Sequence, residues 1–187
     1  MTSLSDEPRM PPTLIIPGWM NSGPDHWQSR WESAHGYQRV QQQDWDSPVV
    51  ADWVARLDEA IRASLTPPVL VAHSLGCIAV AHWAATHNSV RAAAAFLVAP
   101  ADVEQADTPE PLRPFAPIPI QPLPFPTVVV ASRDDPYATF DRAQVLARAW
   151  GAVLVDAGMA GHLNTAAGLG PWPAGEALLH GLVTRLA

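Results

Sequence analysis

One short stretch constrains the fold more than any other, because in it an apolar run passes into a helical pattern without a loop. Residues 69–77 read Val-Leu-Val-Ala-His-Ser-Leu-Gly-Cys, and the helical pattern continues to residue 86. Four apolar residues in a row are typical of a parallel strand that is buried on both faces. A strand that turns directly into a helix predicts a sheet covered by helices, with Ser74 at the junction.

Ser74 occupies the position at which a sharp strand-to-helix turn exposes a hydroxyl above a sheet, an arrangement called a nucleophile elbow. The pattern G-x-S-x-G requires small residues two positions before and after the serine, because neighbouring backbone lies close to both. Gly76 meets this requirement, whereas Ala72 replaces the first glycine and lacks its freedom at positive φ. We therefore predict Ser74 as a nucleophile, with an ordinary turn as the alternative unless an acid and a base follow.

The acid is expected where another buried strand, residues 127–131, ends in Ser-Arg-Asp-Asp-Pro. Carboxyl ends of parallel strands share one edge of a sheet, and ligand sites are built there. Asp135 precedes a proline, which favours an extended backbone that projects the side chain from the strand end. We predict Asp135 as the acid and Asp134 as its solvated neighbour. The alternative is that one or both carboxylates cap the helix that begins near Thr139.

The base is expected after the apolar run 152–155, which continues as Asp-Ala-Gly-Met-Ala-Gly-His. His162 ends this string in a loop that no core requires, so we predict it as the base. His73 is adjacent to the nucleophile, but neighbouring residues point in opposite directions at such a turn. The other histidines lie on expected helices or in loops: His26, His35, His82, His87 and His180. Of these, only His26 stays open as a site residue.

Together these residues predict acyl transfer through a tetrahedral intermediate whose oxyanion needs backbone donors. The N–H of Leu75, directly after the nucleophile, is one expected donor. The second is expected from the loop after residues 13–16, where a glycine permits close approach, so we predict the N–H of Trp19, with Met20 as the alternative. We also predict Trp19, Met20 and His26 as substrate-binding residues.

Several strings of residues are spread over nearly the whole chain after residue 12. They are Pro-Gly-Trp at 17–19, His-Trp-Gln at 26–28 with Trp31, Ala-His-Ser-Leu-Gly at 72–76, Ser-Arg-Asp-Asp-Pro at 132–136, and Gly-His-Leu-Asn at 161–164 with Gly-Leu-Gly-Pro-Trp-Pro at 168–173. In order and spacing this set resembles the bacterial form of the small serine hydrolases related to retinoblastoma-binding protein 9. The whole set is more specific than the elbow alone.

The resemblance implies an α/β-hydrolase fold without a large lid and a triad of Ser74, Asp135 and His162. It also implies esterase-type activity on small acyl substrates. It does not imply binding to pocket proteins, which depends on an L-x-C-x-E motif. The nearest string here, residues 75–79, ends in Ala79 and is expected to lie inside a helix.

Length and composition predict one domain that can bury a core. The chain has 187 residues, of which 48% are hydrophobic, so we expect a single α/β domain over residues 13–187. Residues 1–12 are expected to be disordered or extended; they lack the apolar core of a signal peptide, and no apolar run predicts a membrane span. Cys77 is the only cysteine, which fits a reducing compartment and a buried helical position. We therefore expect a cytoplasmic protein without membrane attachment.

The charge pattern argues against several classes of partner. The formal net charge is -7, and the 11 basic residues, all arginine, are scattered along the chain. Nucleic-acid binding needs a basic stripe, so we expect no nucleic-acid partner. His26 beside Asp25, and His82 with His87, lack a third nearby ligand, so we expect no metal and no cofactor. The expected partner is a small acyl ester or amide substrate, and the sequence indicates no oligomeric state.

Strand and helix patterns alternate, which predicts a three-layer α/β/α sandwich with a mostly parallel sheet. Expected strands cover residues 13–16, 37–41, 69–72, 93–98, 127–131 and 152–155. Expected helices cover residues 26–33, 49–64, 76–86, 140–150 and 174–186. Ser47 followed by Pro48 predicts a capped start for the second helix.

Residues 100–126 interrupt this alternation with nine prolines. Much of the segment cannot form a regular helix and is expected to be an extended, stiff connection. Hydrolases of the fold named above place cap insertions at this point, but the segment is too short for a helical lid. Two interpretations stay open, a cap over a shallow pocket and a connector packed on the surface.

The leading interpretation is a serine hydrolase that acts on small esters. The same triad would serve a peptidase of small amides, which differs only in its leaving group. The alternative from another class is a hydrolase-fold protein that acts as a binding or scaffold module with little turnover.

Overall fold

The computed structural model describes residues 11–87 and 91–186, so nearly all of the segment predicted as disordered or extended, residues 1–12, lies outside the described residues. The described residues form a six-stranded sheet in the order β2-β1-β3-β4-β5-β6, and each neighbouring pair of its strands is parallel. The strands are β1 (Thr13–Ile16), β2 (Gln38–Arg39), β3 (Val69–His73), β4 (Ala94–Val98), β5 (Thr127–Ala131) and β6 (Val153–Asp156).

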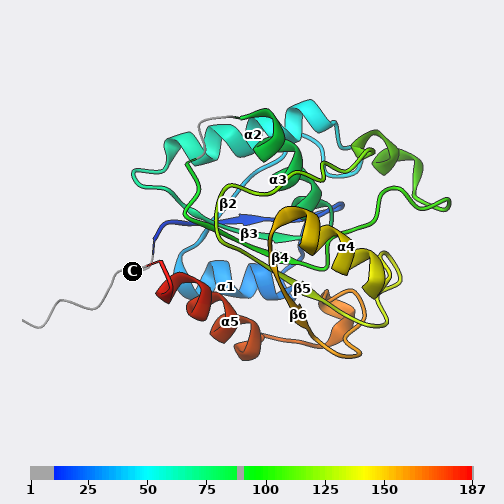
Figure 1. Ribbon diagram of the computed structural model, residues 1–187. Helices are drawn as coiled ribbons and strands as arrows, with labels where there is room; N and C mark the ends of the chain where they lie inside the picture. Colours follow the sequence, from blue (N-terminus) through cyan, green and yellow to red (C-terminus); the bar gives the residue numbers. More distant parts are fainter. Residues whose placement is uncertain (1–10, 88–90, 187) are drawn as a thin grey trace, which may run out of the picture.

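Helices cover both faces of this sheet, as Figure 1 shows. They are α1 (Trp27–His35), α2 (Val50–Ala63), α3 (Leu75–Thr86), α4 (Phe140–Trp150) and α5 (Pro173–Thr184), with the short 3₁₀ helices η1 (Glu110–Phe115) and η2 (Thr165–Ala167). The core on one face is built with α2, α3 and α4, and the core on the other with α1 and α5. The predicted three-layer α/β/α sandwich with a parallel sheet is confirmed. In the described part of the chain no helix is both long and apolar enough to cross a membrane.

The central strands consist mostly of apolar residues because both of their faces are covered. All five residues of β3 are buried. Leu70 and Ala72 join the core under α2 and α3, whereas Val69 and Val71 join the core over α1 and α5. Cys77 on α3 is fully buried as well, and burial raises the pKa of its thiol. The predicted structural position of this cysteine is therefore confirmed.

Two local predictions between β1 and β3 are wrong. The strand expected over residues 37–41 is only two residues long, because β2 is an edge strand that pairs with β1 alone. Ser47 does not cap α2, whose N-cap is Val49 with no side-chain hydrogen bond. The N–H of Ser47 instead donates to Asp44 Oδ1 in the turn before the helix. The remaining expected strands and helices differ from the observed ones by two residues or fewer at either end.

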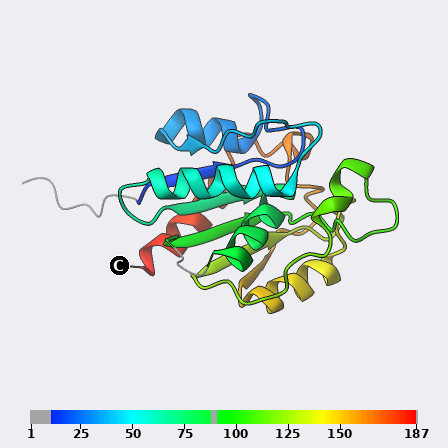
Figure 2. The ribbon, with the colours of Figure 1, turned by 90° about the horizontal axis from the view of Figure 1, so that it is seen from above.

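The proline-rich segment 100–126 packs against the helices rather than standing free. Phe115 is fully buried and Ile118 nearly so, both in the core beside α3. His82 Nε2 on α3 donates to the Phe115 carbonyl at 2.8 Å, and Trp150 Nε1 on α4 donates to the Pro119 carbonyl at 2.8 Å. These contacts hold η1 beyond the carboxyl edge of the sheet (Figure 2). The segment is therefore attached to both α3 and α4, in the same helical layer.

Candidate active site

The turn between β3 and α3 has the sharp geometry expected of a nucleophile elbow. Ser74 has φ 55° and ψ -123°, a conformation that L-residues seldom adopt. A Cβ at Gly76 would lie 2.4 Å from the Ile16 carbonyl oxygen, so only glycine fits beside the end of β1. Ala72 is a fully buried strand residue with an ordinary φ, which explains why a methyl group is accepted at that position.

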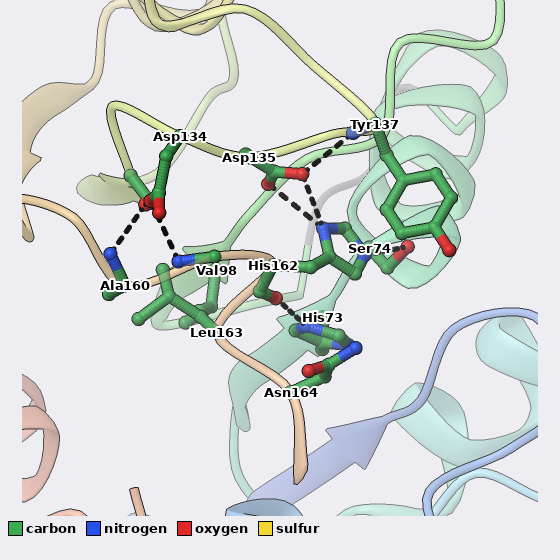
Figure 3. Close-up of polar contacts among 12 residues, drawn as sticks. His73, Ser74, Val98, Asp134, Asp135, Tyr137, Ala160, His162, Leu163 and Asn164 are labelled. Atoms are coloured by element: carbon green, nitrogen blue, oxygen red, sulfur yellow. Dashed lines mark hydrogen bonds and ion pairs between the residues drawn. The ribbon is translucent and has the colours of Figure 1, made fainter. Parts of the chain in front are cut away.

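His162 lies between Ser74 and Asp135, as Figure 3 shows. Its Nε2 is 2.8 Å from Ser74 Oγ, and its Nδ1 is 2.9 Å from both carboxylate oxygens of Asp135. Because an ionised carboxylate only accepts hydrogen bonds, Nδ1 carries the proton and Nε2 is left to accept one from the hydroxyl. The side chains of His162 and Asp135 are 7% and 3% exposed, so the hydrogen bonds between these two side chains are shielded from water.

Asp134 is not merely the solvated neighbour that the sequence predicted. Its Oδ1 accepts hydrogen bonds from Ser132 Oγ at 2.7 Å and from the Gly161 N–H at 2.8 Å. These bonds, the first of them most of all, hold the pKa of the Asp134 carboxyl below its usual value. Neither carboxylate caps α4, because Thr139 Oγ1 accepts the first-turn hydrogen bond of that helix itself.

The expected oxyanion donors lie in two segments that approach each other closely. A Cβ at Gly18 would be 2.8 Å from Ser74 Cβ and 3.3 Å from the Leu75 nitrogen, so the loop after β1 touches the elbow. Within the described residues, the N–H groups of Leu75 and Trp19 have no backbone acceptor, whereas the Met20 N–H donates to the Trp45 carbonyl. The Trp19 indole is fixed by a 2.8 Å hydrogen bond from Nε1 to the Asp46 carbonyl. The geometry thus favours Trp19 over Met20.

A cleft of about 420 Å³ opens beside Ser74 and His162. The predicted substrate-binding residues Trp19, Met20 and His26 line it, and the side chains around it are apolar or uncharged. The other lining residues are Asn21, Gly23, His73, Ala101, Pro109, Leu112, Tyr137, Asn164, Thr165 and Ala166. Two walls therefore come from the loop after β1 and from the proline-rich segment.

His26 serves the fold as well as the cleft. Its Nδ1 accepts from the Gln28 N–H and so caps α1. The side chain is only 4% exposed, and burial, followed by the charges of Arg39 and His162, lowers its pKa to about 4. The ring is therefore neutral near pH 7.

The loop after β1 is held by side chains that the sequence analysis did not identify. Gln28 is fully buried, and its Nε2 donates to the Ile16 carbonyl at the end of β1. Arg39 on β2 donates to Asn21 Oδ1 and to the Ser22 carbonyl. A buried amide and a mostly buried guanidinium need partners, but the sequence does not say which carbonyls supply them.

The sequence analysis also missed what His73 does. As expected, it makes no hydrogen bond to Ser74, but its Nε2 lies 2.9 Å from the backbone carbonyl of His162. Trp27 Nε1 donates to the next carbonyl, that of Leu163, at 2.8 Å. A histidine directly after a strand expected to be buried needs a polar partner, which is the one signal that could have pointed to this contact.

Comparison with known proteins agrees with this fold. The structure is similar to that of a protein from Pectobacterium atrosepticum described as a YdeN-like hydrolase, with 34% identity, a TM-score of 0.85, and 95% of this chain and 93% of that chain covered. The ydeN gene product of Bacillus subtilis is 24% identical with a TM-score of 0.78, covering 94% of this chain and 100% of that one. Esterase 2 of Thermogutta terrifontis is 19% identical with a TM-score of 0.66, covering 98% and 87%. No curated protein matches the chain in sequence.

The parallel sheet, the helical layers and these neighbours define an α/β-hydrolase-like protein. Residues 13–181 match the serine hydrolase family, and the chain belongs to that family. The predicted class of enzyme, a serine hydrolase, is thereby confirmed.

Proposed function

We propose that the protein is a carboxylesterase that hydrolyses small, uncharged acyl esters through Ser74, His162 and Asp135. The observation that carries the proposal is the continuous chain of hydrogen bonds from Asp135 to His162 to Ser74. A nucleophile, a base and a group that orients the base, each within hydrogen-bond reach of the next, are what activated-serine chemistry requires.

In the acylation step, Ser74 Oγ forms a bond to the acyl carbon while its proton passes to His162 Nε2. The carbonyl π electrons move to oxygen, and the N–H groups of Leu75 and Trp19 stabilise the resulting oxyanion. As the intermediate collapses, the bond to the alcohol oxygen breaks and His162 returns the proton to that oxygen. Asp135 keeps the imidazole in the correct tautomer and stabilises its charged form.

Deacylation uses the same groups with water in place of the alcohol. A water oxygen attacks the acyl carbon of the acyl-enzyme while its proton passes to His162 Nε2. Collapse of this second intermediate breaks the bond to Ser74 Oγ, which takes the proton back, and the carboxylic acid leaves. The free enzyme is regenerated without a cofactor.

The cleft supports the choice of substrate. No Asp, Glu, Lys or Arg side chain lines it among the described residues, so charged acyl groups find no partner there. Ala101, Pro109 and Leu112 of the proline-rich segment form one wall, and two hydrogen bonds tie the same segment to α3 and α4. We expect activity to decrease beyond acyl chains of about four to six carbons, because the cleft is open rather than a tunnel.

Related proteins support the ester specificity only by analogy. Esterase 2 of Thermogutta terrifontis has a similar fold, and that similarity is the reason to test esters first. Membership of the subgroup related to retinoblastoma-binding protein 9 stays a prediction from the strings of residues described above. The predicted cytoplasmic location likewise stays a prediction, which cell fractionation would test.

The deciding experiment is labelling with a fluorophosphonate probe, followed by assay of p-nitrophenyl esters of increasing acyl length and of aminoacyl arylamides. The wild type should be labelled and Ser74→Ala should not. Faster turnover of the arylamides than of the esters would assign the site to a peptidase. No labelling and no turnover of either series would favour a binding or scaffold module.

A further inference from the structure

The segment that carries His162, residues 160–163, has little structure of its own. It belongs to no helix or strand, and its one internal backbone hydrogen bond runs from the Leu163 N–H to the Ala160 carbonyl. Gly161 has φ 52° and Leu163 has φ 50°. A positive φ is unfavourable for leucine, so surrounding groups must hold the backbone in place. We call residues 160–163 the base loop.

Side chains from other elements bind each of its four residues in turn. On the amide side, the Ala160 N–H donates to Ser132 Oγ at 2.9 Å and the Gly161 N–H donates to Asp134. The carbonyl side is bound from beneath, with His73 Nε2 at 2.9 Å from the His162 carbonyl and Trp27 Nε1 at 2.8 Å from the Leu163 carbonyl. Figure 3 shows the first of these carbonyl contacts beside the site.

The two donors beneath the loop are themselves fixed. Trp27 is 1% exposed and His73 is 5% exposed. A carbonyl only accepts, so His73 Nε2 carries the proton, and burial keeps the ring neutral by lowering its pKa well below the ordinary value. Each ring packs against further rings, with centroids 4.7 Å apart for His73 and His26 and 5.0 Å apart for Trp27 and Trp172.

We propose that Trp27 and His73 are positioning residues, which hold the backbone of His162 so that its Nε2 stays within reach of Ser74 Oγ. The inference rests on the proposed function, because it assigns a role in the proton transfer described there. An error of about 1 Å in the position of a catalytic group can cost on the order of 10²-fold in rate. Neither side chain needs to touch the substrate for this effect.

The chain offers a closely matched pair of variants. Trp27→Phe removes the N–H that binds the base loop and keeps an aromatic ring. Trp31→Phe removes the same group one turn later on α1, where Nε1 donates to the Pro171 carbonyl outside the base loop. Trp27 and Trp31 pack on each other with ring centroids 4.6 Å apart, so the two variants disturb the same aromatic cluster.

A second pair tests His73. His73→Gln keeps an N–H donor at nearly the same distance from the backbone, whereas His73→Leu has none. Both remove the imidazole and its packing, so they differ mainly in the hydrogen bond to the His162 carbonyl.

The measurements are kcat and KM for a short ester, the rate of fluorophosphonate labelling, thermal unfolding, and the NMR signal of the His162 Nδ1 proton. We expect Trp27→Phe and His73→Leu to lower kcat and the labelling rate by at least about tenfold with KM changed less than twofold. Both should broaden the Nδ1 proton signal. Trp31→Phe should leave kcat and that signal unchanged even if it lowers the unfolding temperature, and His73→Gln should restore most of kcat.

Equal kcat values for Trp27→Phe and Trp31→Phe, or an Nδ1 proton signal unchanged in Trp27→Phe and His73→Leu, would overturn the proposal. Failure of the proposed function looks different, since the wild type itself would then be neither labelled nor active. In that case the Nδ1 proton signal still decides whether Trp27 and His73 position the imidazole.

Discussion

The nucleophile turn, residues 72–76, and the base loop, residues 160–163, bring the two reacting side chains together but are held in different ways. The turn is shaped by close backbone packing, since Gly76 lies against the end of β1 and Gly18 lies against Ser74. The base loop is held by side-chain hydrogen bonds from the ends of β3 and β5 and from α1. Its contact with Trp27 spans 136 residues of sequence.

This difference predicts two kinds of failure. The nucleophile turn should fail when atoms are added, because there is no room for them. The base loop should fail when polar groups are removed, because its backbone then loses the partners that hold it. A short string can encode the first arrangement, whereas the second requires the whole fold.

The largest effect should come from removing either reacting side chain, and it should be the same for the nucleophile turn and for the base loop. Ser74→Ala and His162→Ala should each lower ester hydrolysis by on the order of 10⁵-fold, and the double variant should cost little more, because the groups act as a unit. Steady-state kinetics with active-site titration measures this, with circular dichroism as the control for folding. Near wild-type turnover in either variant would refute the assignment of the nucleophile or the base.

The next effect separates the two aspartates that follow β5. Asp135→Asn should lower kcat by about 10⁴-fold, because the amide no longer stabilises the tautomer and the charged form of His162. Asp134→Asn should cost about tenfold or less, because it weakens only one of four contacts with the base loop. The comparison uses kcat for one ester at one pH, in excess EDTA to exclude a contribution from metal. The opposite ranking would move the acid to Asp134.

A smaller effect tests the steric basis of the nucleophile turn. Gly76→Ala should lower the free energy of unfolding by about 3 kcal/mol, since its methyl group would overlap the Ile16 and Pro17 carbonyls. Gly23→Ala is the control, because a methyl group there meets nothing within 4 Å. Urea denaturation measures both. Equal stabilities for the two variants would show that the turn has more room than the structure indicates.

The smallest effect concerns acid and the buried histidines beneath the base loop. The pKa of His26 is lowered to about 4, so at pH 5 the unfolded chain binds a proton there that the folded chain does not. Stability should therefore fall as the pH decreases from the ordinary histidine pKa of about 6.5, and His26 alone should cost about 2 kcal/mol between pH 7.5 and pH 5. His73, whose pKa is also lowered, should add to the loss in the same direction.

The matched variants for this effect are His26→Asn, which can still cap α1, and His180→Asn on the exposed side of α5. Urea denaturation at the two pH values should show a loss smaller by about 2 kcal/mol in His26→Asn and unchanged in His180→Asn. An undiminished loss in His26→Asn would show that this histidine is protonated in the folded protein.

The sequence by itself determined the layers, five of the six strands to within a residue or so, and the position of the nucleophile turn. These features are local: a buried parallel strand is a continuous apolar run, and a turn as tight as that at Ser74 admits only small neighbours such as Gly76. It also placed Ser74, Asp135 and His162 at the carboxyl ends of strands, where a parallel sheet must bring them to one edge.

Only the tertiary structure decided how these groups are held. The role of Asp134 in binding Gly161, and the contacts of His73 and Trp27 with the base loop, join elements that are far apart in the chain. A polar side chain in a buried position requires a hydrogen-bond partner, but many carbonyls can meet that requirement equally well. Which carbonyl is chosen depends on how the layers pack, and that is a property of the whole sheet and its helices.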